Sequence, residues 1–258
     1  MLDFRRLGLL TKTMNTAAPS ATARLSIIDV PKSCDMLANK LREQILDGSI
    51  ADGAMLPPER DLVEQTGLSR GSVREGLRIL EAEGLIKTRS GRYGGSSVTR
   101  PSGAMVSSQI NLFARVSGIS LISIVEARVT LEPALARLAA LNRTDDDLKQ
   151  LREISQRIVA AYDDVPTYLD ENVNWHCALA QASHNELLHT FTVSIAQLIR
   201  DATAIKNMAP FDVRTAVIKA HDRILDAIVA KDPDTAERRM QRHVRAYAQH
   251  VQLLMEPA

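Results

Sequence analysis

Two short helical patterns joined by a tight turn, in residues 57–82, constrain the fold of this chain more than any other feature. The first pattern starts at a pair of prolines and ends at Gly67, a residue that readily takes the left-handed conformation at a helix C-terminus. Ser69 follows with the hydroxyl of a helix N-cap. The second pattern carries one apolar stripe at helical spacing, made by Val73, Leu77 and Leu80. The segment therefore predicts a helix, a turn and a second helix.

The residues on either side of this pair predict one more helix and a hairpin. Apolar positions from Pro31 onward repeat with a helical period until Asp47 and Gly48 close the pattern. After Gly84, the stretch LIKTRSGRYGGSSVTR has the pattern of two short strands around a glycine-rich tip. Helix, helix, turn, helix and hairpin together make a winged helix-turn-helix, a fold whose last helix enters the major groove of DNA.

The charge of the chain is unevenly distributed, although its net value is only +1. Between residues 67 and 100 basic residues outnumber acidic ones, and Arg70 and Arg74 lie four apart on a helix face away from the apolar stripe. A lone pair of arginines with this spacing most often only solvates a helix. Within a complete winged helix, the same pair is better interpreted as a DNA contact.

The stretch LPPERDLVEQTGLSRGSVREGLRILEAEGLIKTRSGRYGG, residues 56–95, closely resembles the DNA-binding domain of GntR-family bacterial transcription regulators. The resemblance implies a set of residues at or near operator DNA, with the last two on the wing: Arg60, Ser69, Arg70, Gly71, Ser72, Arg74, Gly91 and Arg92. Several of these contacts should go to phosphate groups, which position a protein without reading sequence. A bidentate arginine on a guanine edge would supply the specificity.

The whole chain divides into three parts on these patterns. Residues 1–24 are largely small and polar without a period, so we expect a flexible leader, and translation can start at Met1 or Met14. Residues 25–100 form the winged helix, and residues 101–258 have helical periodicity to the end. The low aromatic content, 3%, favours helices with aliphatic seams over a β-sandwich. We therefore expect a mainly α protein, with an N-terminal winged helix-turn-helix followed by an antiparallel all-helical bundle.

The C-terminal part resembles the FCD effector domain of the FadR subfamily of the same regulators. The resemblance rests on EARVTLEPALARLAA early in the domain and on HDRILDAIVAKDPDTAERRMQRHV late in it. A further helix at about residues 103–117 is similar to one found in the seven-helix form of this domain. The resemblance implies that residues 101–258 bind an effector and dimerise. A homodimer is also expected because one recognition helix reads too few base pairs for genomic specificity.

Three histidines of the predicted bundle have a spacing that brings them together. His221 precedes the turn at Asp232 and Pro233 by nearly as many residues as His243 follows it, so on antiparallel helices the two lie at nearly the same height. His176 is the third. Any one buried histidine is more often an ordinary polar residue of a bundle interior. Three converging imidazoles, however, are typical of a site for a divalent transition metal with positions left open for water or ligand.

The resemblance to FCD domains implies the full set of metal ligands. Many of these domains hold a metal through an Asp-x-x-x-His pair and two later histidines, which here correspond to Asn172, His176, His221 and His243. This chain departs from the pattern at Asn172, whose carbonyl oxygen is a neutral and weaker ligand than a carboxylate. The expected metal is zinc, with nickel or manganese as alternatives, and the all-neutral ligand set leaves more positive charge to attract an anion.

Arg128 lies on an otherwise apolar stretch of the bundle. An arginine that faces a bundle interior needs an anionic partner to offset the loss of its hydration. One candidate partner is the carboxylate of an effector, which the resemblance supports, and the other is Glu132 one helical turn later. The sequence favours neither. The only tryptophan, Trp175, is expected to fill the core.

These features predict a homodimeric regulator, repressor or activator, that binds double-stranded operator DNA and responds to a small carboxylate metabolite. We expect it in the cytoplasm, because Cys34 and Cys177 lack a disulfide pattern and the apolar N-terminal pieces are too short for a signal peptide or a membrane span. The alternatives are a metal-dependent enzyme in the bundle and a direct metal sensor. Because the chain contains neither an HExxH sequence nor a nucleophile motif, we expect no enzymatic activity.

Overall fold

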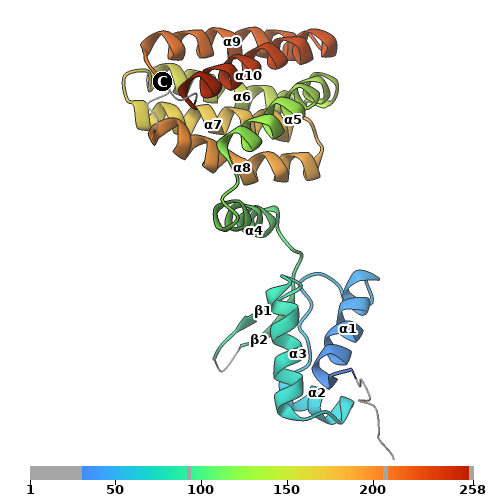
Figure 1. The fold of residues 1–258 in the computed structure, drawn as a ribbon. Helices are drawn as coiled ribbons and strands as arrows, with labels where there is room; N and C mark the ends of the chain where they lie inside the picture. Colours follow the sequence, from blue (N-terminus) through green and yellow to red (C-terminus); the bar gives the residue numbers. More distant parts are fainter. Residues whose placement is uncertain (1–30, 92–93, 206–208, 256–258) are drawn as a thin grey trace, which may run out of the picture.

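The computed structural model describes residues 31–91, 94–205 and 209–255, and shows a small N-terminal part and a larger helical part with helix α4 between them (Figure 1). The predicted fold class is confirmed, since both parts are mainly helical apart from one small hairpin. The expected leader, residues 1–24, and both candidate start residues lie outside the described residues.

The N-terminal part is the winged helix that the sequence predicts. In chain order it consists of α1 (Ser33–Leu46), α2 (Glu59–Thr66), α3 (Arg70–Ala82), β1 (Ile86–Arg89) and β2 (Gly95–Val98). The strands are antiparallel, with Ile86 opposite Val98 and Arg89 opposite Gly95. The turn between α2 and α3 has the expected chemistry, because Gly67 is left-handed with a φ of 68° and the side chain of Ser69 accepts a hydrogen bond from the backbone N–H of Ser72.

A compact apolar core holds α3 against α1 and the hairpin. It is formed by the buried residues Leu37, Ala38, Leu41, Leu56, Leu62, Val73, Leu77, Leu80, Leu85, Ile86 and Val98. The two helices approach closely at Gly76, where a Cβ atom would lie 3.0 Å from the carbonyl oxygen of Cys34. The predicted stripe of α3 therefore faces this core and leaves the opposite face of the helix exposed.

Seven helices make up the rest of the described chain. They are α4 (Gly103–Val116), α5 (Leu121–Asn142), α6 (Asp145–Ala160), α7 (Val165–Ala182), α8 (Glu186–Ile205), α9 (Phe211–Val229) and α10 (Pro233–Met255). Local capping explains several boundaries; at the start of α6, Thr144 and Asp147 form the reciprocal hydrogen bonds of a capping box. Helix α4, at the position of the additional predicted helix, packs on α8, where Arg115 donates a hydrogen bond to Asp201.

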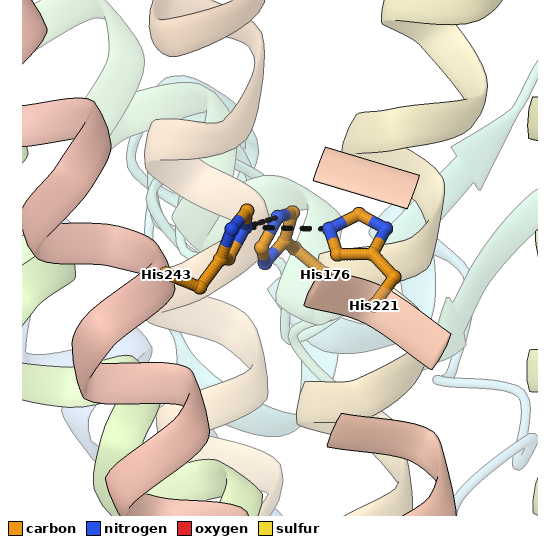
Figure 2. Close-up of side chains that lie close together, drawn as sticks. All are labelled: His176, His221 and His243. Carbon is orange, nitrogen blue, oxygen red and sulfur yellow. Dashed lines mark hydrogen bonds between the residues drawn. The ribbon is translucent and has the colours of Figure 1, made fainter. Parts of the chain in front are cut away.

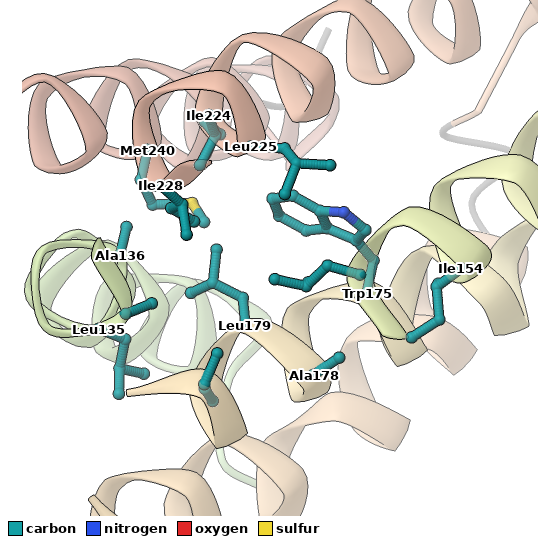
Figure 3. Packing of buried hydrophobic residues seen from close by; sticks show 14 of the residues in the cluster. Leu135, Ala136, Ile154, Trp175, Ala178, Leu179, Ile224, Leu225, Ile228 and Met240 are labelled. Atoms are coloured by element: carbon teal, nitrogen blue, oxygen red, sulfur yellow. The ribbon is translucent and has the colours of Figure 1, made fainter. Parts of the chain in front are cut away.

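The bundle encloses one large apolar core between α5, α6, α7, α9 and α10 (Figure 3). Leu135, Leu179 and Ile228 are almost fully buried there. Trp175 is buried as predicted, and its indole N–H donates to the hydroxyl of Ser155 at 3.2 Å. None of the helices in the described residues has the length and apolar character needed to cross a membrane.

Candidate DNA-binding surface and histidine cavity

The predicted DNA-contacting residues of the helix pair lie on or beside the first turn of α2 and the first two turns of α3. The side chains of Arg60, Arg70 and Arg74 are exposed. Arg74 reaches back to α2 and donates to Glu59 with an N–O distance of 2.9 Å, while Nε of Arg60 lies 3.1 Å from a carboxylate oxygen of Asp61. Such exposed ion pairs contribute little stability, so both guanidinium groups can exchange a carboxylate for a phosphate at low cost.

The small residues at the start of α3 leave its N-terminal end open. Ser69 and Gly71 are exposed and Ser72 is half-buried. Backbone N–H groups at the start of a helix favour a bound anion, so this end has the chemistry for a phosphate group. On the wing, Gly91 is exposed with a φ of 116°, whereas Arg92 lies outside the described residues.

The structure brings the three predicted histidines together from three helices (Figure 2). His176 comes from α7, His221 from α9 and His243 from α10. Nε2 of His243 lies 3.3 Å from Nε2 of His221 and 3.4 Å from Nε2 of His176. His176 and His221 are buried, and His243 is half-buried.

Two nitrogen separations in this histidine cluster match those between ligands of one divalent metal ion, and all three ligand nitrogens lie within 4.8 Å of one another. Two imidazole nitrogens bound to one ion at about 2.0 to 2.1 Å are separated by roughly 2.9 to 3.4 Å in tetrahedral or octahedral arrangements. Burial lowers the pKa values of His176, His221 and His243, and neighbouring positive groups lower them further. The rings are therefore held in the neutral form, which is the form that binds metals.

Two further observations concern the fourth predicted ligand, Asn172. It lies one helical turn before His176 on α7 and lines the same cavity as His243. Its carbonyl oxygen is buried and has no hydrogen-bond partner among the described residues. Because an orphaned buried acceptor costs about 1 to 3 kcal/mol, a ligand at this oxygen would remove a real penalty. The neighbouring acids point elsewhere, since Asp170 pairs with Arg200 and Glu171 with Arg157.

Arg128 is paired inside the protein. Its Nε donates to Glu132 at 2.5 Å, and both side chains are only 5% exposed. Burial alone would raise the pKa of Glu132, but Arg128 and His176 more than offset this and lower it to about 2. Of the two partners that the sequence allows for Arg128, Glu132 is therefore the one that the structure shows, and it balances the charge of Arg128.

The same pair also contacts His176. The second oxygen of Glu132 lies 2.8 Å from Nδ1 of His176, although the two atoms lack the alignment of a good hydrogen bond. On the other side of the ring, Nη2 of Arg128 donates to Nε2 at 2.5 Å. A proton on Nδ1 and a lone pair on Nε2 satisfy both neighbours. A metal ion and Arg128 would compete for that lone pair.

A cavity of about 390 Å³ lies beside the histidine cluster, between α7, α8, α9 and α10 and with Arg128 of α5 on its wall. Its lining includes apolar side chains such as Leu169, Val217 and Tyr247, together with Asn172 and His243. It also contains the guanidinium-bearing residues Arg128, Arg200, Arg223, Arg239 and Arg242. No aspartate or glutamate is among the described residues that line it. The cavity therefore suits an anion with an apolar portion.

Sequence reasoning missed four of these five arginines. A signal for one of them exists, since Arg239 precedes His243 by four positions and so lies on the same face of α10. His250, for which the sequence suggested no role, also lines the cavity. Which face of α9 and α10 meets a cavity depends on how α7 and α8 pack, and this cannot be read from local spacing.

Comparison with known protein families also divides the chain into a DNA-binding part and a helical part. The chain matches bacterial regulatory proteins of the gntR family over residues 34–93 and the FCD domain over residues 123–246. It is 29% identical over 220 residues to the Glc operon transcriptional activator of Escherichia coli (strain K12), covering 82% of this chain and 86% of that protein. It is 27% identical over 221 residues to the transcriptional repressor NanR of Citrobacter rodentium, covering 83% of this chain and 84% of the relative. The solved structure of Streptococcus agalactiae GntR matches with a TM-score of 0.60 and 25% identity, over 84% of this chain and 99% of that one.

Proposed function

Because this chain belongs to the GntR family of bacterial DNA-binding transcription regulators, with an FCD domain after its winged helix, we propose that a small organic acid controls its binding to operator DNA. The observation that carries this proposal is the arginine-lined cavity beside the histidine cluster. A cavity with guanidinium groups and no carboxylate in its described lining stabilises a bound anion and disfavours a cation.

Operator binding is assigned to the exposed end of the helix pair. In this proposal Arg70 and Arg74 read base edges from α3, while Arg60 and the N-terminal end of α3 hold phosphate groups. The working unit is a homodimer, so the operator is a short palindrome with one half-site for each recognition helix. Light scattering at micromolar concentration tests this; a monomer that binds one asymmetric site tightly would contradict it.

A divalent metal is part of the proposed effector site. His176, His221 and His243 would hold it, with the orphaned carbonyl oxygen of Asn172 as the fourth donor. Zinc suits three imidazoles best, and nickel or manganese are alternatives. When bound, the ion supplies a fixed positive charge that attracts an anionic oxygen. Around it, Glu132 orients the ring of His176, and Trp175 stacks on His221 with 3.8 Å between ring centroids.

The relatives named above are regulators, and we propose that this chain has no catalytic activity either. A regulator of this kind acts on DNA, so the cytoplasm remains the expected location. A direct metal sensor is disfavoured by the cavity itself, because sensing an ion alone needs no 390 Å³ space with an apolar wall.

The proposal is tested by selecting an operator from a random DNA pool and measuring its affinity with and without candidate acids. The purified full-length protein is first loaded with zinc, and a panel of small carboxylates is screened for thermal stabilisation. We expect at least one acid to stabilise the protein and to change operator affinity by about 5-fold to 150-fold, the usual range of allosteric coupling. A panel in which stabilising acids leave operator affinity unchanged would refute the regulatory role of the cavity.

A further inference from the structure

Two of the five arginines around the cavity are balanced by a carboxylate, Arg128 by Glu132 and Arg200 by Asp170, and the other three have no carboxylate partner among the described residues. The inner group is Arg128 with the histidine cluster, and the outer group consists of Arg223, Arg239 and Arg242. Resting on the function proposed above, we propose that the effector carries two acidic groups: an inner one at the histidine cluster and an outer one held by these three arginines.

The inner group has a limited capacity for anions. Arg128 is neutralised by Glu132 at 2.5 Å, so it adds no net charge to the cavity. Its Nη2 also donates to Nε2 of His176 at 2.5 Å, so two of its three guanidinium nitrogens already have partners. The inner end can therefore bind one acidic group, through the proposed metal site and the remaining N–H groups of Arg128.

The outer group, in contrast, has no carboxylate partner. Among the described residues none forms an ion pair with Arg223, Arg239 or Arg242, whereas Arg200 of α8, which also lines the cavity, is paired with Asp170. Arg239 instead donates to the backbone carbonyl oxygen of Arg223, which ties α10 to α9 at this end of the cavity.

Acids elsewhere on α9 do not take the place of this partner. Asp222 and Asp226 lie near the outer arginines in sequence but do not line the cavity. Like charges held side by side at a cavity without a counter-charge are unfavourable, and an acidic ligand removes this cost.

The separation of the two groups sets the size of the ligand. Arg239 lies four residues before His243 on α10, which corresponds to about 6 Å along the helix axis. Arg242 lies one residue before His243 on α10, and Arg223 lies two residues after His221 on α9, so Arg239 sets the longest of these axial separations. A ligand whose two acidic groups are joined by a short chain of a few atoms spans this distance. A dicarboxylate or a phosphorylated hydroxy acid has this form.

The experiment compares diacids with their own monoamides on the zinc-loaded, full-length protein by isothermal titration calorimetry. The probes are malonate, succinate, glutarate and adipate, 2-phosphoglycerate, 3-phosphoglycerate, and glycerate as the monoacid counterpart of the phosphorylated pair. A monoamide keeps the length and one carboxylate but removes the second charge. We expect at least one diacid to bind about 10-fold or more tightly than its monoanionic counterpart.

Arginine variants assign the second acid to the outer group. Arg239→Met and Arg242→Met should each remove most of the diacid preference while leaving monoacid affinity within about 2-fold, and Arg239→Lys should retain part of it. Arg238→Met is the matched control, because Arg238 lies on the same helix, bonds only Thr235 among the described residues and does not line the cavity. Thermal unfolding of each variant shows whether the bundle is intact.

Each result decides the question. If monoacids bind as tightly as every diacid tested, the second acidic group is wrong although the proposed function stands. If the two methionine variants weaken monoacids and diacids equally, the outer arginines do not hold a separate group and the inference fails. If no acid of either kind binds, the cavity is not an effector site and the proposed function fails with it.

Discussion

Each part of this protein contains one arginine–glutamate pair at a predicted functional position, and the two pairs differ in burial. In the winged helix, Arg74 and Glu59 are 59% and 43% exposed, whereas Arg128 and Glu132 in the bundle are each 5% exposed. The exposed pair can open to accept a DNA phosphate with little loss of stability. The buried pair is part of the framework, because removing either partner leaves an uncompensated charge in the interior.

The comparison shows which arginines of each part are available to bind an anionic partner. On α3 the arginines that are predicted to read DNA are exposed, and the carboxylate that pairs with Arg74 is solvated. In the bundle the most deeply buried arginine is occupied, and the available charges lie farther out, on Arg223, Arg239 and Arg242. Burial therefore separates arginines that hold the fold from arginines that are free to bind.

The strongest test of this comparison is Glu132→Gln. The substitution leaves the buried guanidinium of Arg128 without its counter-charge, so the free energy of unfolding of the bundle should fall by about 3 to 5 kcal/mol. Urea unfolding measures it. The double variant Arg128→Met, Glu132→Met removes both charges and should recover much of the loss. A single variant as stable as the unmodified protein would show that the buried pair is not part of the framework.

The next test asks whether the histidine cluster of the bundle affects the response to effector without affecting operator binding by the winged helix. We expect His221→Ala and His243→Ala to lose more than about 100-fold in metal affinity, since even supporting residues of metal sites contribute 10-fold to 100-fold. The effector should then no longer influence operator binding, while operator affinity without effector stays unchanged. Metal analysis and titration of labelled operator measure both. His184→Ala, outside the cluster, is the control, and a variant that loses its metal yet responds normally to effector would refute the role of the metal.

On the DNA side, Arg70→Ala and Arg74→Ala should each weaken operator binding by about 1 to 3 kcal/mol if they read bases, with the fold unchanged. Their exposed positions four residues apart on α3 are the reason. Arg78→Ala, which removes an exposed arginine paired with Glu75 on the same helix, serves as the control. Equal losses on operator and random DNA would show that the residue contacts phosphate groups instead of bases. Unchanged binding for both variants would refute the prediction that α3 reads the operator.

The smallest expected effect is that of Glu59→Ala. Loss of an exposed ion pair should change the free energy of unfolding by less than about 1 kcal/mol. Operator affinity should stay the same or rise slightly, because a carboxylate near the phosphate backbone is removed and Arg74 is released. Thermal unfolding and operator titration give the two values. A loss of unfolding free energy as large as that of Glu132→Gln would show that the exposed and the buried pair do not differ in their contribution to stability.

Features with local causes could be predicted from the sequence. The ends of α2 and α3 depend on Gly67 and Ser69, and the start of α6 depends on Thr144, all within a few residues of the groups that they satisfy. The meeting of His221 and His243 follows from equal distances to one turn between antiparallel helices. The DNA contacts of α3 and the wing remain predictions.

Features that depend on packing between distant helices could not be predicted. The sequence did not show whether Arg128 pairs with Glu132 or with an effector. The answer depends on the surroundings of Arg128, which include His176, a residue 48 positions away in the sequence. The outer arginines were missed for the same reason, since α9 and α10 each have several polar faces and only the packing of α7 and α8 shows which one borders a cavity. The sequence therefore indicates the cluster but not the charges around it.

The stacking of Trp175 on His221 gives the molecule a built-in optical reporter. The chain contains one tryptophan, so its indole emission comes from a single place, against a ring of the histidine cluster. The emission of such a fluorophore depends on the charge and contacts of the ring beside it, so events at the cluster should change its colour or intensity. The winged helix holds no tryptophan, so emission excited selectively from indole does not come from it. Occupancy of the bundle can thus be followed without labels while DNA is bound.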